Sequence, residues 1–448
     1  MTRLAKGMFI TRYFSSNTRA ARLNVENYVR QNSPSISNQH FYMNKILDQY
    51  VQQQATPITL RQLVFYERHM NIDRLLKSAN YVRRELPIRI SHRIREFQKL
   101  PFIVGTNPNI QMVYDLYWQA FERLRKVPPI TSMEENEDFC RLLKESLEAH
   151  LVVIPRLAQG ISECEQHIDP ERLDRFMNGT LRSRISRRVL TEQHLVLSQY
   201  KHGITTIHAS SPLSSSGDLS RSTQQTVFSR CSAHDVVGMC SALAQANARQ
   251  IHRQGPEWIP PQVHITHRDS DVEFTYVSEH IEYIIYQILS NSIRHTIAAH
   301  PQQQQQQQQQ QYPPIEVTIC SNQSDVFFRI SDKGGGMSND VHKHLWSYGR
   351  RPHKTFGNFR DISQLAAKPS EHWNVPLGIG LPMSRVYAEY WGGEINVVTM
   401  EGCGTDAYVR IPILGTQNEN LDMEDNHDIS ASSPSSSSSG ILRRQFIV

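Results

Sequence analysis

The first half of the chain carries a helical pattern of apolar residues. Between about Thr56 and Tyr200, apolar positions recur every three to four residues and strand signals are few. In the segment 171–197 this spacing lines up Leu173, Phe176, Met177, Leu181, Ile185, Val189 and Leu190. We expect four such helices to form an N-terminal four-helix bundle over 56–205.

Four arginines share the last of these helices. They are Arg182, Arg184, Arg187 and Arg188. The simplest interpretation is a solvated helix face, and a face turned toward phosphate is the alternative.

The second half alternates strand and helix patterns. Strands are predicted at 271–277, 315–320, 326–330, 395–400 and 406–413, where β-branched and other apolar residues alternate with polar ones. A helix is predicted at 279–299 from the spacing of its isoleucines. We therefore expect an α+β sandwich over 223–413, with helices on one face of a mixed sheet.

Low-complexity segments separate these parts. A Ser-rich linker is expected at 206–222, and ten glutamines at 302–311 form a surface insertion, because such tracts cannot bury apolar surface. Residues 26–55 are a leader or linker, and residues 414–448, acidic and then Ser-rich, are expected to be a disordered tail.

The formal charge of +5 is concentrated at the N-terminus. Residues 1–25 contain five basic side chains and no acidic one, and without them 43 basic residues face 43 acidic ones. This acid-free, Arg- and hydroxyl-rich segment is typical of a mitochondrial transit peptide, with a disordered basic tail as the alternative. We therefore expect a matrix protein and no nucleic-acid partner.

Neither membrane insertion nor a cysteine framework is indicated. No stretch approaches 18 uninterrupted apolar residues, so no membrane span is expected. The six cysteines lie far apart without a Cys-x-x-Cys pair, which argues against a zinc site and against disulfides.

The sequence Asp332-Lys333-Gly334-Gly335-Gly336 follows a predicted strand directly. A carboxylate at a strand end can accept a hydrogen bond from an exocyclic amine, and glycines allow the backbone to approach a flat base or a phosphate. An ordinary tight turn would use the same residue types.

A second glycine cluster, Gly378-Ile379-Gly380-Leu381-Pro382, precedes a predicted helix. Free N–H groups at a helix start commonly hold phosphate, although a plain hinge also uses glycine. The segment 337–377 between the two clusters would then be a lid over a nucleotide.

On the helix 279–299, Gln287, Asn291 and Arg294 are four and three residues apart and therefore share one stripe. An amide oxygen is a suitable Mg²⁺ ligand, and a guanidinium neutralises phosphate charge. A polar solvent-exposed face would show the same spacing.

Taken in chain order with the turn Gly402-Cys403-Gly404-Thr405-Asp406, these elements resemble the nucleotide site of the GHKL superfamily. The helical half adds Glu85-Leu86-Pro87-Ile88-Arg89, Leu100-Pro101-Phe102-Ile103-Val104-Gly105 and Glu192-Gln193-His194. Over roughly 55–413 the chain therefore resembles the mitochondrial 2-oxoacid dehydrogenase kinases, most of all the branched-chain member and next the pyruvate members.

This resemblance implies a protein serine kinase that uses Mg-ATP to inactivate the alpha subunit of a decarboxylase component. It also implies docking to lipoyl domains of the acyltransferase core and a homodimer paired through the nucleotide domain. Asn291 would bind Mg²⁺ and Asp332 the adenine amine. The other expected ATP contacts are Gly334, Gly336, Gly378, Gly380, Leu381 and Thr405.

The chain departs from the family at the position of its general base. A glutamate usually stands four residues before the Mg-binding asparagine, but this chain has Gln287. An amide cannot accept the substrate proton, so either catalysis is slowed or the protein is an ATP-binding, catalytically weak regulator. Substitute bases are His194, His295 and, less favourably, Glu282.

Smaller departures surround the lid. Ser290 replaces the usual lysine, and Pro376 replaces a glycine. The residues around Arg350-Arg351-Pro352 replace a Ser/Thr pair, which argues against the K⁺ site that the family resemblance would place there. A two-component histidine kinase ranks last, because the chain lacks a phosphoacceptor histidine helix.

Overall fold

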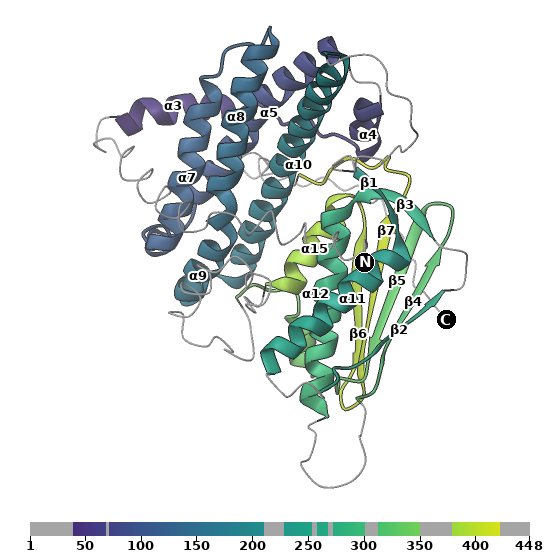
Figure 1. Ribbon diagram of the computed structural model, residues 1–448. Coiled ribbons are helices and arrows are strands. Elements are labelled where there is room, and N and C mark those ends of the chain that lie inside the picture. The colour runs from purple at the N-terminus through teal and green to yellow at the C-terminus, as the bar shows by residue number, and fades with distance from the viewer. Residues whose placement is uncertain are drawn as a thin grey trace, which may run out of the picture.

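The computed structural model describes residues 39–68, 71–209, 228–252, 258–267, 272–300, 312–349 and 379–421. The predicted transit peptide at 1–25, most of the Ser-rich linker and the glutamine tract lie outside the described residues. The described chain forms a helical part followed by a part that contains both sheet and helix (Figure 1).

The helical part contains four long helices and several short ones. The long helices are α5 (Ile72–Gln98), α7 (Pro108–Arg125), α8 (Met133–Ala149) and α10 (Pro170–Ala209). The shorter ones are α3 (Gln39–Val51), α4 (Leu60–Arg68), α6 (Phe102–Gly105), α9 (Val153–Cys164) and the 3-10 turns η1 (His150–Val152) and η2 (Glu165–His167). Helix α3 shows that the expected leader or linker at 26–55 includes a helix.

Local sequence signals set the starts of these helices. Ser132 and Glu135 form a reciprocal capping box at the start of α8. The Asn107 side chain caps α7, in which Pro108 takes the first helical position, where a missing N–H costs nothing. The apolar faces then meet in a shared core, where the rings of Phe97 on α5 and Phe176 on α10 pack edge to face at 5.0 Å.

The second part is built on a five-stranded mixed sheet with the order β2-β4-β5-β7-β6. Strands β2 (Val263–His267) and β4 (Ile315–Ser321) pair in parallel, and β5 (Asp325–Asp332), β7 (Gly404–Pro412) and β6 (Glu394–Met400) continue the sheet antiparallel. Helices α11 (Ala233–His252), α12 (Ser278–Ala299) and α15 (Gly380–Tyr390) cover one face, between the sheet and α10 (Figure 1). The short helix α13 (Asn339–Lys343) follows β5.

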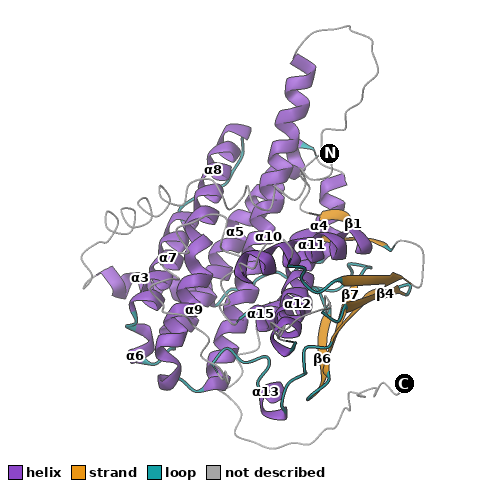
Figure 2. Ribbon diagram, turned by 60° about the horizontal axis from the view of Figure 1, so that its bottom comes forward, coloured by secondary structure: helices purple, strands orange, loops and turns teal. Residues whose placement is uncertain are grey.

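The turned view shows the same layering (Figure 2). The described helices stand on one side of the sheet. The expected mixed sheet with helices on one face is therefore present.

One predicted strand belongs to a different sheet. Strand β3 (Glu273–Val277) pairs only with β1 (Phe228–Ser232), in a separate two-stranded antiparallel sheet. Our prediction placed this strand in the main sheet and missed β1 and β2. Both missed strands have five residues, and β2 is an edge strand in which His264 and His267 interrupt the apolar positions, so neither shows a strong pattern.

The chain after the last strand is not free where we expected the disordered tail to begin. Glu419 is 5% exposed, and its carboxylate accepts hydrogen bonds from two nitrogens of Arg89 at 2.7 and 3.1 Å and from the Ile58 N–H at 3.2 Å. It also bonds the Tyr390 hydroxyl at the end of α15. The cause is specific pairing of a buried charge, which composition does not reveal, so residues 415–421 tie the two parts together.

None of the helices in the described chain is long and apolar enough to cross a membrane. All six cysteines lie in the described residues, and none of them forms a disulfide there. Cys403 is exposed and Cys320 half-buried, whereas Cys140, Cys164, Cys231 and Cys240 are buried.

Candidate functional site

Helix α12 carries the predicted stripe along one wall of the candidate site. The Arg294 guanidinium donates a 2.9 Å hydrogen bond to Oδ1 of Asn291. Asn291 lies one turn beyond Gln287, and both side chains are half-buried. Asn291, the predicted Mg²⁺ ligand, is thus hydrogen-bonded to Arg294, the cation that we expected beside phosphate.

Asp332 ends strand β5 and faces the same helix. Its Oδ2 accepts a 2.8 Å hydrogen bond from Oγ of Ser292, and its Oδ1 accepts one of 2.9 Å from the N–H of Gly334. Our sequence analysis did not single out Ser292, because it lies next to Asn291 and therefore about 100° around the helix from the predicted stripe.

The glycines after Asp332 allow the loop to contact the turn between β6 and β7. Gly335 and Gly336 have φ values of +79° and +67°, which side chains rarely adopt. A Cβ on Gly336 would lie 2.1 Å from the carbonyl oxygen of Met400, and the Gly402 N–H donates to the Gly335 carbonyl at 2.8 Å. Only glycine fits this close backbone approach.

Thr405 joins this group through strand pairing. It stands opposite Asp332 in the β5–β7 register. Its hydroxyl lies 3.3 Å from that of Thr399, which accepts a 2.9 Å hydrogen bond from the N–H of Met337. The structure therefore brings Asp332, Gly334, Gly336 and Thr405 together, and we call this region the Asp332 end of the site.

The start of α15 forms the opposite end. A Cβ built on Gly380 would lie 2.4 Å from Oε1 of Gln287, so the absence of a side chain lets this amide rest on the first turn of the helix. Leu381 is half-buried beside it, whereas Gly378 lies outside the described residues. We call Gln287 and Gly380 the Gly380 end. From Gln287 to Ser292 the helix rises about 7.5 Å.

The proposed substitute bases lie elsewhere. His194 is fully buried in the helical part, where its Nδ1 is 3.2 Å from Oγ of Ser78 and its Nε2 is 3.0 Å from Oδ1 of Asn136. Burial lowers its pKa to about 4. Both ring nitrogens have partners, so our suggestion of His194 as a base does not agree with its position.

His295 and Glu282 are no better placed for the Gly380 end. The Cβ of His295 is 2.9 Å from the Cβ position of Gly334, which puts this histidine at the Asp332 end. Burial, and then the neighbouring Glu279, raise the pKa of Glu282 to about 7, which suits a base, but it lies on the turn of α12 before Gln287 and off the stripe.

Two arginines of α10, Arg182 and Arg188, lie at the boundary between the two parts, and the other two bond within the helical part, so the four do not form a solvated face. Arg182 donates to Glu389 on α15 at 2.9 Å, and Arg188 donates to Glu192 at 2.7 Å and to Glu279 on α12 at 3.2 Å. The other two are Arg184, which bonds the His150 carbonyl, and Arg187, which bonds the Tyr117 hydroxyl. The expectation failed because helical spacing does not show that this face meets a second domain.

Ser347 and Tyr348, near the end of the described part of the expected lid, rest on α10. The Tyr348 N–H and the Ser347 hydroxyl both donate to Oδ1 of Asp174, at 2.8 and 3.2 Å. The Tyr348 hydroxyl donates to Oδ1 of Asn178 at 2.9 Å. Residues 350–378, including the departures at Arg350-Arg351-Pro352 and Pro376, lie outside the described residues.

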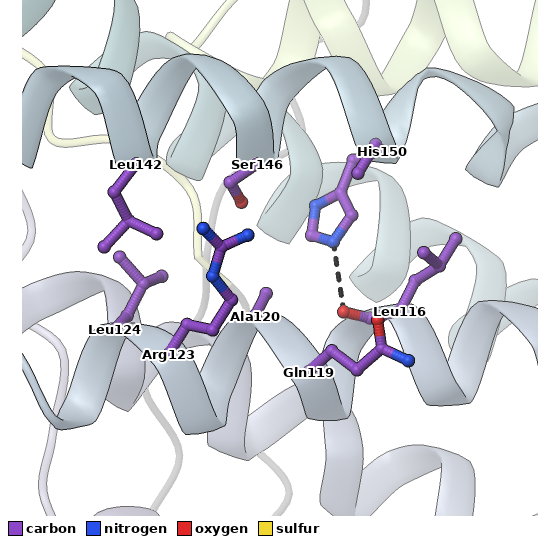
Figure 3. A pocket seen from close by; sticks show the side chains of 9 residues that line it. Leu116, Gln119, Ala120, Arg123, Leu124, Leu142, Ser146 and His150 are labelled. Carbon is purple, nitrogen blue, oxygen red and sulfur yellow. Dashed lines mark hydrogen bonds between the residues drawn. The ribbon is translucent and has the colours of Figure 1, made fainter. Parts of the chain in front are cut away.

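A small cavity lies between α7 and α8 (Figure 3). His150 lies at one end of it, with Nε2 3.3 Å from the Leu116 carbonyl oxygen, and burial lowers its pKa to about 3. Its lining comes from the helical part: Leu116, Gln119, Ala120, Arg123, Leu124, Leu142, Ser146, Ala149 and His150. None of the predicted nucleotide contacts is among them.

The residues fit Mg-ATP. Mg²⁺ usually takes one or two protein oxygens together with substrate phosphates and water, which Asn291 can satisfy. An ionised carboxylate accepts but cannot donate hydrogen bonds, which suits an exocyclic amine at Asp332.

Two family models match consecutive parts of the chain. The model of the mitochondrial branched-chain alpha-ketoacid dehydrogenase kinase matches residues 57–238. The model of the histidine kinase-, DNA gyrase B- and HSP90-like ATPases matches residues 276–415, which include both ends of the site.

Curated relatives match across both parts. Kinase 2 of pyruvate dehydrogenase (acetyl-transferring) from Saccharomyces cerevisiae mitochondria is 27% identical, over 88% of this chain and 89% of the relative. The mitochondrial pyruvate dehydrogenase kinase of Arabidopsis thaliana is 28% identical, over 82% and 93%. The rat mitochondrial isozyme 4 is 27% identical, over 81% and 82%.

Proposed function

Because this chain belongs to the family of mitochondrial 2-oxoacid dehydrogenase kinases within the GHKL superfamily, we propose that it phosphorylates a serine of a decarboxylase alpha subunit and inactivates that complex. The chain is an ATP-dependent protein kinase by this membership. The proposed target is either the pyruvate or the branched-chain complex, and the proposed location is the mitochondrial matrix.

The observation that most directly supports this function is the arrangement of the Asp332 end and the Gly380 end along α12. We assign the adenine to the Asp332 end and the phosphates to the Gly380 end, where the free N–H groups at the start of α15 favour negative charge. Asn291 lies between the two ends, where it would hold Mg²⁺. Arg294 would move from the Asn291 oxygen to neutralise phosphate charge.

Transfer itself depends mainly on positioning and on charge neutralisation. Asn291, Arg294 and the α15 start supply these functions. Gln287 stands where the family has its base, and its amide can orient a serine hydroxyl but cannot take its proton. The proton would pass to solvent or to the phosphate, so we expect slow transfer.

The deciding experiment incubates the full mature chain with each purified decarboxylase component and labelled ATP. We expect incorporation into one alpha subunit, and an increase of about 10²- to 10⁴-fold for Gln287→Glu, because a positioned base contributes that much. Asn291→Ala is the control that removes the Mg²⁺ ligand and should abolish the signal. No incorporation into either component, with or without Gln287→Glu, would overturn the proposal.

A second function is favoured by Gln287 alone. In this alternative the protein binds ATP, transfers almost no phosphate and regulates the complex by occupying the acyltransferase core. Gln287→Glu should then create activity where the natural chain has none. A natural chain that already phosphorylates, at a rate the substitution does not raise, excludes this alternative.

The proposed partners are supported by exposed apolar side chains. We propose that α5, α7, α8 and α10 act as a four-helix bundle that docks lipoyl domains, since the helical part exposes Phe65 and Phe102, by 54% and 84%.

We propose a homodimer through the sheet, since edge strand β6 exposes Val398 and Met400, by 61% and 67%. Sedimentation equilibrium, alone and with lipoyl domain, tests both.

A further inference from the structure

Ser292 is directed away from its own helix. A serine within a helix commonly bonds the carbonyl four residues earlier, but this hydroxyl reaches across to strand β5 and donates to Oδ2 of Asp332 at 2.8 Å. The side chain is 4% exposed. A buried hydroxyl that forms its bond to a carboxylate in another element has a definite orientation.

The carboxylate of Asp332 is held at both oxygens as a result. The Gly334 N–H fixes Oδ1 at 2.9 Å and the Ser292 hydroxyl fixes Oδ2. Both partners are donors, and together they prevent rotation about the terminal torsion of the Asp332 side chain. The remaining lone pairs therefore point in fixed directions.

We propose that Ser292 is a positioning residue for nucleobase selection, which orients Asp332 toward the exocyclic amino group of adenine. This inference rests on the proposed function of the site. A carboxylate fixed as an acceptor pairs with an amino group but repels the carbonyl that guanine carries at the same position. Ser292 therefore contributes to discrimination between bases through Asp332, without touching the nucleotide.

The test measures equilibrium binding to the full chain, without any phosphotransfer. The probes are ATP and purine riboside triphosphate, which lacks the exocyclic amino group. Ser292→Ala removes the hydroxyl and Ser292→Thr retains it. Ser290→Ala is the matched control, because it removes a serine hydroxyl two residues away on the same helix, and the described hydrogen bonds to Asp332 do not include Ser290.

For Ser292→Ala we expect the Kd for ATP to rise about tenfold while the Kd for purine riboside triphosphate stays unchanged, since a hydrogen bond to a charged group is worth about that factor or more. Ser292→Thr should restore most of the discrimination, and Ser290→Ala should preserve it.

Equal loss of affinity for both nucleotides would show a merely structural role and overturn the inference. No change for either nucleotide would overturn it as well. Failure of the proposed function gives a different result: ATP binding with the expected discrimination but without phosphorylation removes the kinase activity and leaves the role of Ser292 intact. Absence of ATP binding to the natural chain removes both.

Discussion

Replacement of Glu419 should destabilise both parts of the protein at once. Its side chain is 1% exposed and that of Arg89 is 2% exposed. Burial alone would lower the pKa of Arg89, but the adjacent Glu419 carboxylate raises it, so the guanidinium remains charged in the interior. Glu419→Gln keeps the shape and removes the charge, leaving the guanidinium with Glu85 as its remaining acidic partner, at 3.3 Å.

Breaking a buried ion pair from one side costs about 3–5 kcal/mol, and we expect the lower end of this range because Glu85 still compensates part of the Arg89 charge. A domain of 150–250 residues shifts by about 2–4 °C per kcal/mol, so we expect the unfolding midpoint to fall by about 6 °C or more. A chain that ends at Leu414 should show a similar loss, whereas one that ends at Leu421 should not.

The assay is thermal unfolding followed by circular dichroism. The exposed neighbour Asn418→Ala is the control on the same segment. Arg89→Met should also lower the midpoint, because it leaves the buried Glu85 and Glu419 carboxylates without their shared cation. A midpoint for Glu419→Gln within about 2 °C of the natural chain, or equal stability of the chains ending at Leu414 and Leu421, would refute the reasoning.

Two further outcomes are expected. Gly336→Ala should lower the free energy of unfolding by at least about 2 kcal/mol, because the added Cβ would meet the Met400 carbonyl at a position with positive φ. Gly238→Ala should raise it by about 0.5–1 kcal/mol, because a Cβ on this helical glycine meets no atom within 4 Å. Equal effects of the two variants in denaturant unfolding would contradict this prediction. Burial lowers the pKa of His194 from 6.5 to about 4 in the folded state, so the unfolded state binds more protons between these pH values. The free energy of unfolding should therefore fall by up to about 3 kcal/mol as the pH drops from 6.5 to 4. His194→Gln should make the stability less dependent on pH in this range. A pH dependence as steep as that of the natural chain would show that His194 is not its cause.

Helices and strands with strong local patterns could be predicted from the sequence alone. The predicted helix 279–299 is α12, and the strands predicted near 315–320, 326–330, 395–400 and 406–413 are β4, β5, β6 and β7. Apolar periodicity is a local signal, so it survives without knowledge of partners. The separate pairing of β3 with β1 depends on a strand more than 40 residues away, which no local pattern encodes.

For the site, spacing could place side chains on one helix but not across elements. Gln287, Asn291 and Arg294 lie on one stripe as predicted, but the contact of Ser292 with Asp332 joins a helix to a strand 40 residues later. The same limit explains His194, whose contacts with α5 and α8 no single-helix pattern shows, and Glu419, which is buried although its charge suggested an exposed position. The roles of the site residues in ATP binding stay predictions for the experiments above.

Two of the contacts between the helical part and the second part lie on the paired helices α12 and α15. Arg188 binds Glu279 in the first turn of α12, and Arg182 binds Glu389 near the end of α15, both on the far side of Gln287 from Asp332. We expect a displacement of the helical part to reach α12, which carries Gln287 and Asn291, through these two ion pairs.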